Sequence, residues 1–393
     1  MLRIYFHRYV NVWAKFRFKC RDGMTFTQAM VDEINRQVDH LCSLRFTEDE
    51  VAFIGTPRYM RKAKGFLEFL RMYKLNRKYI HISLGESGKL DLWAEGPVFQ
   101  VSYFETPVLA IISEVYYRYA LNATSYEYDQ AVTCGQGRLR NKIHEVVADG
   151  YPVPLVEFGT RRRFSRDHQE WVLQTLIEGF NGTECTLIGT SNVMFAMKYG
   201  LTLIGTFAHE YVCLGQALEG VQLIKSQKHQ FEEWMDEYDG DLGVILGDTL
   251  GKDMFFDVDF GRKLSMASEG SRHDSGPEIA YGEKAIQHYR SYNIEPMTKK
   301  IAWSNALKFT VNGCVKLLSH FDGRIGGLAC IGTDLTNDMG VPAVNIVYKL
   351  VEANGKPVAK LSDDAGKGMC EDPEHETYLR AQIAKTLEQA GKY

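Results

Sequence analysis

Four residue types that can do chemistry stand side by side at Arg272, His273, Asp274 and Ser275, and Gly276 follows them. Arginine binds planar carboxylates and phosphates through paired hydrogen bonds, and aspartate can bind a ribose hydroxyl, a metal ion or a developing positive charge. The same residues could instead form a structural group whose polar atoms satisfy one another. The density of the cluster favours a binding site over packing alone.

Thr206, His209 and Glu210 form a second cluster, which follows an apolar stretch. If a helix starts here, Thr206 and His209 lie on one side of a turn, and Glu210 could carry or orient a proton. A neutral imidazole is a competent nucleophile toward a phosphoryl group. A single histidine after a strand is also often structural, so the residue types alone leave both interpretations open.

Two further segments could bind phosphate. Gly332 and Thr333 follow an apolar strand, where glycine lets backbone amides turn toward an anion, although a capped strand-to-helix turn is the alternative. Arg161, Arg162 and Arg163 follow a strand that ends in Gly-Thr. Adjacent helical residues face different directions, so at most two of these cations can contact one ligand. The segment is either a pyrophosphate or triphosphate clamp or a solvated basic helix start.

These clusters can form one site only if the fold brings them together. The sequence shows a repeated strand–helix pattern that predicts such a fold. From about Leu155, short apolar runs each end in glycine with a small polar residue, and amphipathic stretches follow. The runs that fit the pattern are 187–191, 203–206, 244–248 and 329–333. Barrel enzymes build their active sites at the carboxyl ends of such strands. The pattern predicts an α/β fold with an irregular α/β barrel over residues 126–340.

The two ends of the chain predict a second, α+β lobe. Residues 15–20 alternate as a strand would, and residues 107–119 are typical of an apolar helix entered through a proline. Beyond Val341, the pattern predicts strands at 343–350 and 358–361 and a charged helix near 376–388. We therefore assign residues 1–125 and 341–393 to one lobe.

Composition excludes several classes of protein. The 393 residues are 45% hydrophobic and 24% charged, as in globular chains, and a net charge of -4 gives no electrostatic case for a nucleic-acid partner. No run reaches the roughly 18 apolar residues that a membrane helix needs, and the start lacks a secretory signal. The eight cysteines show no paired spacing, which indicates neither zinc nor disulfides and predicts a reducing cytoplasm.

Several segments, taken in order, resemble nicotinate phosphoribosyltransferase over nearly the whole chain. They are residues 157–163, 189–193, 205–210, 273–276 and 332–333, with weaker likeness at 17–20, 105–107, 321–323, 345–352 and 360–363. This family joins nicotinate to the ribose of phosphoribosyl pyrophosphate in NAD salvage, giving nicotinate mononucleotide and pyrophosphate. It couples the reaction to ATP hydrolysis through a phosphohistidine, so the resemblance implies ATP as a co-substrate and Mg²⁺ as a cofactor.

The resemblance also implies roles for individual residues. His209 matches the phosphorylated histidine, Thr206 and Arg272 match residues that hold nicotinate, and Asp274 lies where ribose and metal are bound. Gly332 and Thr333 match the loop that holds the 5-phosphate. The expected catalytic residues are His209, Glu210 and Asp274, and the other expected substrate contacts are Arg161, Ser165, Asn192 and Ser275. The family also implies a homodimer whose active site is completed by the partner.

Two departures from the family pattern leave alternatives open. The family normally begins with an Asp-x-Tyr-Lys segment whose tyrosine stacks on nicotinate, and Met1 falls about where that segment ends. The family also continues Asp-Ser-Gly with Asp-Pro, whereas Pro277 and Glu278 stand here, so Glu278 joins Asp274 as a candidate metal ligand. The alternatives are a non-catalytic relative that binds phosphoribosyl ligands and an enzyme that uses nicotinamide or another pyridine.

Overall fold

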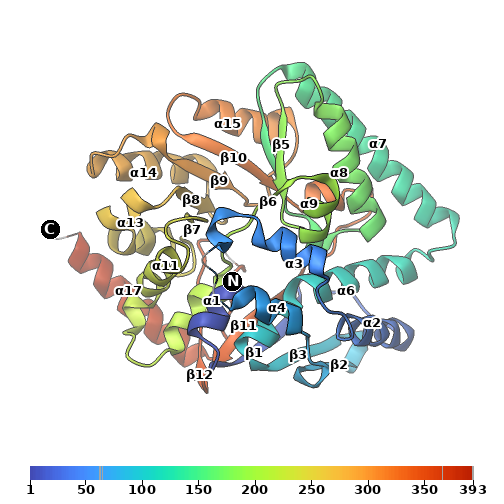
Figure 1. Ribbon diagram of the computed structural model, residues 1–393, viewed down its shortest axis with the longest axis horizontal. Helices are drawn as coiled ribbons and strands as arrows, with labels where there is room; N and C mark the ends of the chain where they lie inside the picture. Colours follow the sequence, from blue (N-terminus) through green and yellow to red (C-terminus); the bar gives the residue numbers. More distant parts are fainter. Residues whose placement is uncertain (62, 64, 365, 392–393) are drawn as a thin grey trace.

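The protein is an α/β fold with two sheets (Figure 1). The computed structural model describes every residue except 62, 64, 365 and 392–393. The larger sheet is parallel, has the strand order β6-β5-β4-β10-β9-β8-β7 and curls into a half-barrel, which confirms the barrel prediction. Its strands are β4 (Pro154–Glu157), β5 (Thr186–Thr190), β6 (Thr202–Leu203), β7 (Val244–Leu246), β8 (Gly270–His273), β9 (Lys300–Trp303) and β10 (Gly326–Ile331).

Helices alternate with these strands, as the sequence pattern predicts. They are α7 (Tyr126–Asp149), α8 (Arg166–Phe180), α9 (Val193–Tyr199), α10 (His209–Leu214), α11 (Ser226–Glu237), α12 (Lys252–Met254), α13 (Arg262–Ala267), α14 (Glu278–Ser291), α15 (Lys316–His320) and α16 (Thr333–Thr336). Two π-helices, Phe255–Asp259 and Val311–Val315, continue α12 and precede α15. Side-chain caps set several starts: Ser125 caps α7, which ends at Gly150 in the left-handed region, with φ 81°.

The smaller sheet is antiparallel and joins both ends of the chain, as predicted for the second lobe. Its order is β12-β11-β1-β3-β2, with β1 (Trp13–Cys20), β2 (Ile80–Leu84), β3 (Leu90–Pro97), β11 (Ile346–Ala353) and β12 (Lys356–Pro357). The helices of this lobe are α1 (Leu2–Arg8), α2 (Gln28–Leu41), α3 (Glu48–Gly55), α4 (Phe66–Met72), α5 (Val98–Val101) and α6 (Glu105–Ala120). The last helix, α17 (Pro373–Ala390), packs against α12 and the π-helix Phe255–Asp259 of the barrel lobe. The domain bounds near 125 and 340 stay a prediction.

One predicted strand is wrong. Residues 358–361 contribute only an isolated bridge between Lys360 and Met369. The apolar alternation misled the prediction because Gln216 takes the place of a partner strand. Its side-chain amide donates to the Ala359 carbonyl at 2.7 Å and accepts from the Ala359 N–H at 2.8 Å. The backbone is thus buried and satisfied without a sheet ladder.

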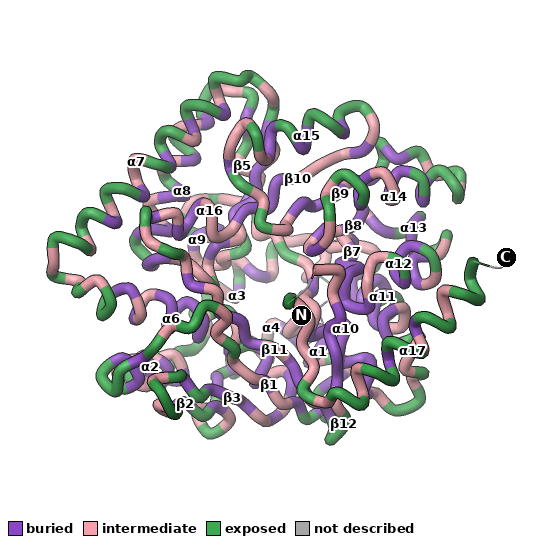
Figure 2. The backbone as a smooth tube through the Cα atoms, turned by 180° about the vertical axis from the view of Figure 1, so that it is seen from behind, coloured by how far each residue is buried: buried purple, intermediate pink, exposed green. Residues whose placement is uncertain are grey.

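The two lobes meet at the carboxyl ends of the parallel strands. Arg162, after β4, donates from Nε to the carbonyl of Ile346 in β11 at 3.1 Å. Leu361, beyond β12, donates its N–H to the Thr249 carbonyl after β7 at 2.8 Å. Figure 2 shows buried residues concentrated in the sheets and in α10 and α11, while α7 and α17 remain largely exposed. Within the described residues, no helix combines the length and apolar character needed to cross a membrane.

Candidate active site

His209 begins α10 and lies between two carboxylates that come from different strands. Its Nε2 is 2.8 Å from Oδ1 of Asp248, after β7, and 3.5 Å from Oδ2 of Asp274, after β8. Burial, and then the charge of Lys360, lower the pKa of His209 to about 4. The imidazole is therefore neutral near pH 7, donates its Nε2 proton to Asp248 and leaves the Nδ1 lone pair for chemistry.

Asp248 is a site residue that the sequence clusters did not include. Its Oδ2 accepts the Ser275 hydroxyl at 2.7 Å and lies 3.3 Å from Nζ of Lys360. Burial alone would raise the pKa of Asp248, but His209 and Lys360 hold it well below its ordinary value. Asp248 thus fixes the histidine ring and ties three separate segments together. The only signal in the sequence was the Gly-Asp pair that ends the strand 244–248.

Asp274 and Arg272 belong to one polar group with a residue that the sequence did not single out, Ser304. Arg272 donates from Nε to Oγ of Ser304 at 3.0 Å, and its Nη2 lies 3.5 Å from Oδ1 of Asp274. Ser304 Oγ is also 3.0 Å from Asp274 Oδ1. Burial would raise the pKa of Asp274, but the charge of Arg272 and the adjacent His209 lower it. The carboxylate is therefore ionised beside the histidine.

Thr206 and Glu210 flank the histidine in different ways. Thr206 donates its hydroxyl to the carbonyl of Val244 at 2.7 Å, which links the end of β6 to β7 across the open side of the half-barrel. Glu210 is buried, and its Oε1 has no hydrogen-bond partner in the described part of the chain. Burial, and then the nearby charge of Glu105, raise the pKa of Glu210 to about 8. Glu210 is thus protonated near pH 7.

The glycine turn at Gly332 packs directly against the turn after β4. A Cβ on Gly332 would lie 2.8 Å from the Phe158 carbonyl oxygen, so a side chain there would clash. The N–H groups of Thr333 and Asp334 have no acceptor among the described residues, whereas the next N–H, of Leu335, bonds to the Gly332 carbonyl at 3.0 Å. The turn therefore presents free backbone donors, as the phosphate prediction requires.

Ser165 and Asn192 cap helices. The Ser165 hydroxyl accepts the His168 N–H at the start of α8, and the Asn192 side chain accepts the Phe195 N–H at the start of α9. Asn192 also donates to Oγ1 of Thr160 at 3.2 Å. These contacts are structural, and the substrate contacts expected of both residues stay predictions.

The side chains of the three consecutive arginines contact three different partners, as expected for adjacent residues of a helical turn. Arg161 contacts Glu105 at 2.9 Å, Arg162 contacts a β11 carbonyl, and Arg163 contacts Gln169 at 3.2 Å. Their 3₁₀ turn, Thr160–Arg162, directs each side chain to a different element. Only part of the segment can therefore serve one ligand.

Further cations gather around Arg161 without enough anions to match them. Arg21, just after β1, has a buried Nη2 with no hydrogen-bond partner in the described part of the chain, and burial with the charge of Arg161 lowers its pKa. Burial with the charges of Lys360 and Arg21 lowers the pKa of Lys349 to about 8. Burial with the charge of Arg161 lowers that of Arg162 to about 10. Such mutual repulsion is typical of a site that binds a multivalent anion.

His209, Asp248 and Asp274 also form a group that could hold a metal ion. One ligand atom from each lies within 4.8 Å of the others. Two carboxylates suit a hard cation such as Mg²⁺, which prefers oxygen ligands. Glu278, the other expected metal ligand, begins α14 and lies outside this group.

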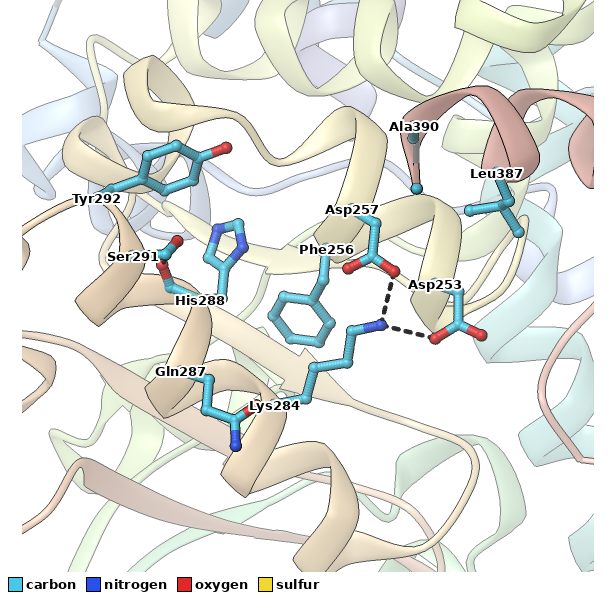
Figure 3. Close-up of a pocket in the computed structure, with 11 residues that line it drawn as sticks. Asp253, Phe256, Asp257, Lys284, Gln287, His288, Ser291, Tyr292, Leu387 and Ala390 are labelled. Carbon is cyan, nitrogen blue, oxygen red and sulfur yellow. Dashed lines mark hydrogen bonds and ion pairs between the residues drawn. The ribbon is translucent and has the colours of Figure 1, made fainter. Parts of the chain in front are cut away.

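A separate hollow lies on the outer side of the barrel lobe, between α14 and the end of α17 (Figure 3). It encloses about 660 Å³, and Lys284 extends along it to ion pairs with Asp253 at 2.7 Å and Asp257 at 2.8 Å. None of the predicted site residues lines it. The chemistry that the sequence predicts therefore lies at the strand ends and not in this hollow.

Comparisons with known proteins agree with the fold. The model of the nicotinate phosphoribosyltransferase family matches residues 153–387, and that of the family's N-terminal domain matches residues 1–113. A nicotinate phosphoribosyltransferase of Acidovorax sp. (strain JS42) is 39% identical, with 97% of this chain and 94% of the relative covered.

Two solved structures have the same fold. The nicotinate phosphoribosyltransferase of Vibrio cholerae superposes with a TM-score of 0.88 at 32% identity, covering 100% of this chain and 94% of the other. That of Porphyromonas gingivalis gives a TM-score of 0.87 at 30% identity, covering 98% and 96%.

Proposed function

The chain belongs to the nicotinate phosphoribosyltransferase family and is an enzyme that acts on nicotinate and phosphoribosyl pyrophosphate, and we propose that it couples this reaction to ATP hydrolysis through His209. The observation that carries the proposal is a neutral, partly buried histidine held by Asp248 next to the ionised Asp274. Three strand ends of the parallel sheet, where barrel enzymes act, supply these side chains. NAD salvage is the pathway consistent with this activity.

The transfer step needs electrostatic help more than a protein nucleophile. The pyridine nitrogen of nicotinate bonds to C1 of the ribose, the bond from C1 to the pyrophosphate oxygen breaks, and positive charge builds on the sugar. Asp274, kept ionised by Arg272 and His209, can stabilise that charge. Its position within 3.5 Å of the histidine joins the transfer site to the proposed phosphorylation site.

Two places suit the phosphate groups of phosphoribosyl pyrophosphate. One offers backbone N–H donors, and the other offers cationic side chains. The 5-phosphate fits the free N–H groups of Thr333 and Asp334 beside Gly332. The pyrophosphate, or the triphosphate of ATP, fits the cations Arg21 and Lys349 beside Arg161. An anion bound there would relieve the repulsion among them, which is the reason that we place it there.

ATP coupling follows from the state of the histidine ring. Attack by Nδ1 on the γ-phosphorus forms a nitrogen–phosphorus bond and releases ADP, and later attack by water returns the histidine and releases phosphate. Lys360 lies against Asp248 and can balance the added negative charge. Asp248 and Asp274 are the residues that would hold Mg²⁺, which would neutralise charge on the departing pyrophosphate.

We further propose that the enzyme acts as a homodimer in the cytoplasm. All eight cysteines are free thiols, as in proteins of a reducing compartment. The homodimer rests on the family resemblance, in which the partner completes the active site, and sedimentation of the purified protein tests it.

Substrate choice tests the proposed function through Arg272. Wild-type protein should release nicotinate mononucleotide from nicotinate and phosphoribosyl pyrophosphate, faster with ATP, and use nicotinamide poorly. Arg272→Met should raise the KM for nicotinate roughly ten- to a hundredfold, since a charge-assisted hydrogen bond contributes about 1.5–3 kcal/mol. The ratio of kcat/KM for nicotinate over nicotinamide should fall with it. Ser304→Ala, which keeps the guanidinium, is the control, and an unchanged ratio in Arg272→Met would refute the carboxylate contact.

Arg21 tests the proposed phosphate site. Arg21→Met should raise the KM for phosphoribosyl pyrophosphate about tenfold while the KM for nicotinate stays near the wild-type value, because one desolvated cation near a polyanion is lost. Lys19→Met, two residues earlier in β1 but exposed, makes the same change of charge away from the cluster and should have little effect. Equal effects of the two substitutions in steady-state kinetics would contradict this assignment.

A further inference from the structure

Lys142, in the middle of α7, contacts the segment that follows β10 through one hydrogen bond and two ion pairs. Its Nζ lies 2.8 Å from the carbonyl oxygen of Asp334, 2.8 Å from Oδ2 of the same residue and 2.9 Å from Oδ2 of Asp338. The Lys142 side chain is only 12% exposed. The ammonium is thus held by three contacts with this one segment.

The contacted segment carries negative charge where an anion is expected to bind. Asp334 directly follows Thr333, and both belong to the first turn of α16, where their two N–H groups have no acceptor among the described residues. A carboxylate so close to a phosphate dianion opposes binding unless a cation neutralises it. Oδ2 of Asp334 is occupied by Lys142 and by the Phe309 N–H at 2.8 Å. Lys142 is therefore the counter-charge for this turn.

Asp338 adds a second carboxylate to the same ammonium. Burial alone would raise the pKa of Asp338, but Lys142 and Arg138 hold it below its ordinary value, so it is ionised. Arg138 contacts the other oxygen of Asp338 at 2.5 Å, with a side chain that is 49% exposed. Solvent screens Arg138 far more than Lys142, so the two cations are not equivalent.

Other contacts hold the rest of the segment without charge. Thr336 donates to the Gly159 carbonyl at 3.2 Å, and Asn337 donates to the Arg162 carbonyl at 2.7 Å. These bonds fix the backbone between the two aspartates whether or not Lys142 is present. The distinct contribution of Lys142 is thus the neutralisation of Asp334 and Asp338.

We propose that Lys142 is a positioning residue for phosphoribosyl binding: by neutralising Asp334 and Asp338 it keeps the Gly332 turn able to accept the 5-phosphate dianion. The inference rests on the proposed function, which places that phosphate at the turn. Lys142 then affects the binding of the 5-phosphate end of the substrate and not of its other end. The pyrophosphate end of the substrate is bound by other cations, Arg21 and Lys349.

Competitive inhibition separates the two ends of the substrate. In Lys142→Met, the KM for phosphoribosyl pyrophosphate and the Ki for ribose 5-phosphate should rise about tenfold or more, because Asp334 then has no counter-charge and Asp338 keeps only the exposed Arg138. The Ki for pyrophosphate, the KM for nicotinate and kcat should each stay within about threefold of wild type. Arg138→Met removes only the exposed partner of Asp338 and should leave the Ki for ribose 5-phosphate within about twofold.

A variant in which Lys142, Asp334 and Asp338 are all replaced by neutral residues tests whether charge causes the loss of ribose 5-phosphate binding. The triple variant K142M/D334N/D338N has no unpaired carboxylate, so its Ki for ribose 5-phosphate should return to within about threefold of wild type. If Lys142→Met does not fold, the triple variant is the one in which the Ki for ribose 5-phosphate is measured. A tenfold loss in the triple variant, or parallel changes in the Ki values of ribose 5-phosphate and pyrophosphate in Lys142→Met, would overturn the proposal. A wild-type protein that makes no nicotinate mononucleotide would instead refute the proposed function.

Discussion

ATP-dependent phosphate labelling of the protein should disappear when His209 is replaced by alanine. In the structure Asp248 holds the Nε2–H of a neutral imidazole at 2.8 Å, so Nδ1 is the free nucleophilic atom. Without the ring, the nucleophilic nitrogen that Asp248 orients is lost. Stimulation of nicotinate mononucleotide synthesis by ATP should fall to none, while the reaction without ATP should remain measurable.

Acid-labile ³²P from γ-labelled ATP, together with rates measured with and without ATP, provides both readouts. His144→Ala, an exposed histidine on α7, is the matched control and should keep full labelling. Retention of labelling in His209→Ala would assign the phosphorylation to another residue. Loss of the ATP-free reaction as well would indicate that His209 also supports the transfer step.

The sequence predicted the parts of this site that lie in short contiguous motifs. His209 and the run from Arg272 to Ser275 stand at strand ends, and the strand–helix pattern was sufficient to place those ends on one edge of a sheet. The partner of His209 was harder to predict. Asp248 follows a strand as other acidic residues do, and only the three-dimensional pairing of β7 with β8 brings it to the ring.

Other contacts could not be predicted because they cross between distant segments. Lys142 occupies an ordinary mid-helix position, and nothing near it in sequence indicates the aspartates about 190 residues later that it contacts. The false strand at 358–361 has the same origin, since a side chain of Gln216, far away in the sequence, replaces a backbone partner. Local patterns report burial and periodicity, whereas long-range polar partners require the fold.

Asp274→Asn should lower kcat by about 10²- to 10³-fold, the range seen when one preorganised group that stabilises transition-state charge is lost. The amide keeps the size and one oxygen acceptor of the carboxylate, so it can still accept from a ribose hydroxyl. It loses the negative charge that Arg272 and His209 maintain. Positive charge on the ribose exists only in the transition state, so kcat should fall much more than the KM for phosphoribosyl pyrophosphate rises.

Two comparisons show whether the charge of Asp274 itself is responsible. Asp253→Asn makes the same chemical change in the outer hollow of Figure 3, where the carboxylate pairs with Lys284, and should leave kcat unchanged. The ATP-free rate of Asp274→Asn separates the transfer step from phosphorylation of His209, whose Nε2 lies 3.5 Å from the substituted group. If the ATP-free kcat is normal and only the ATP-stimulated rate falls, Asp274 serves the histidine and not the ribose. An equal fall in both rates places its charge at the sugar, because that step is common to the two reactions.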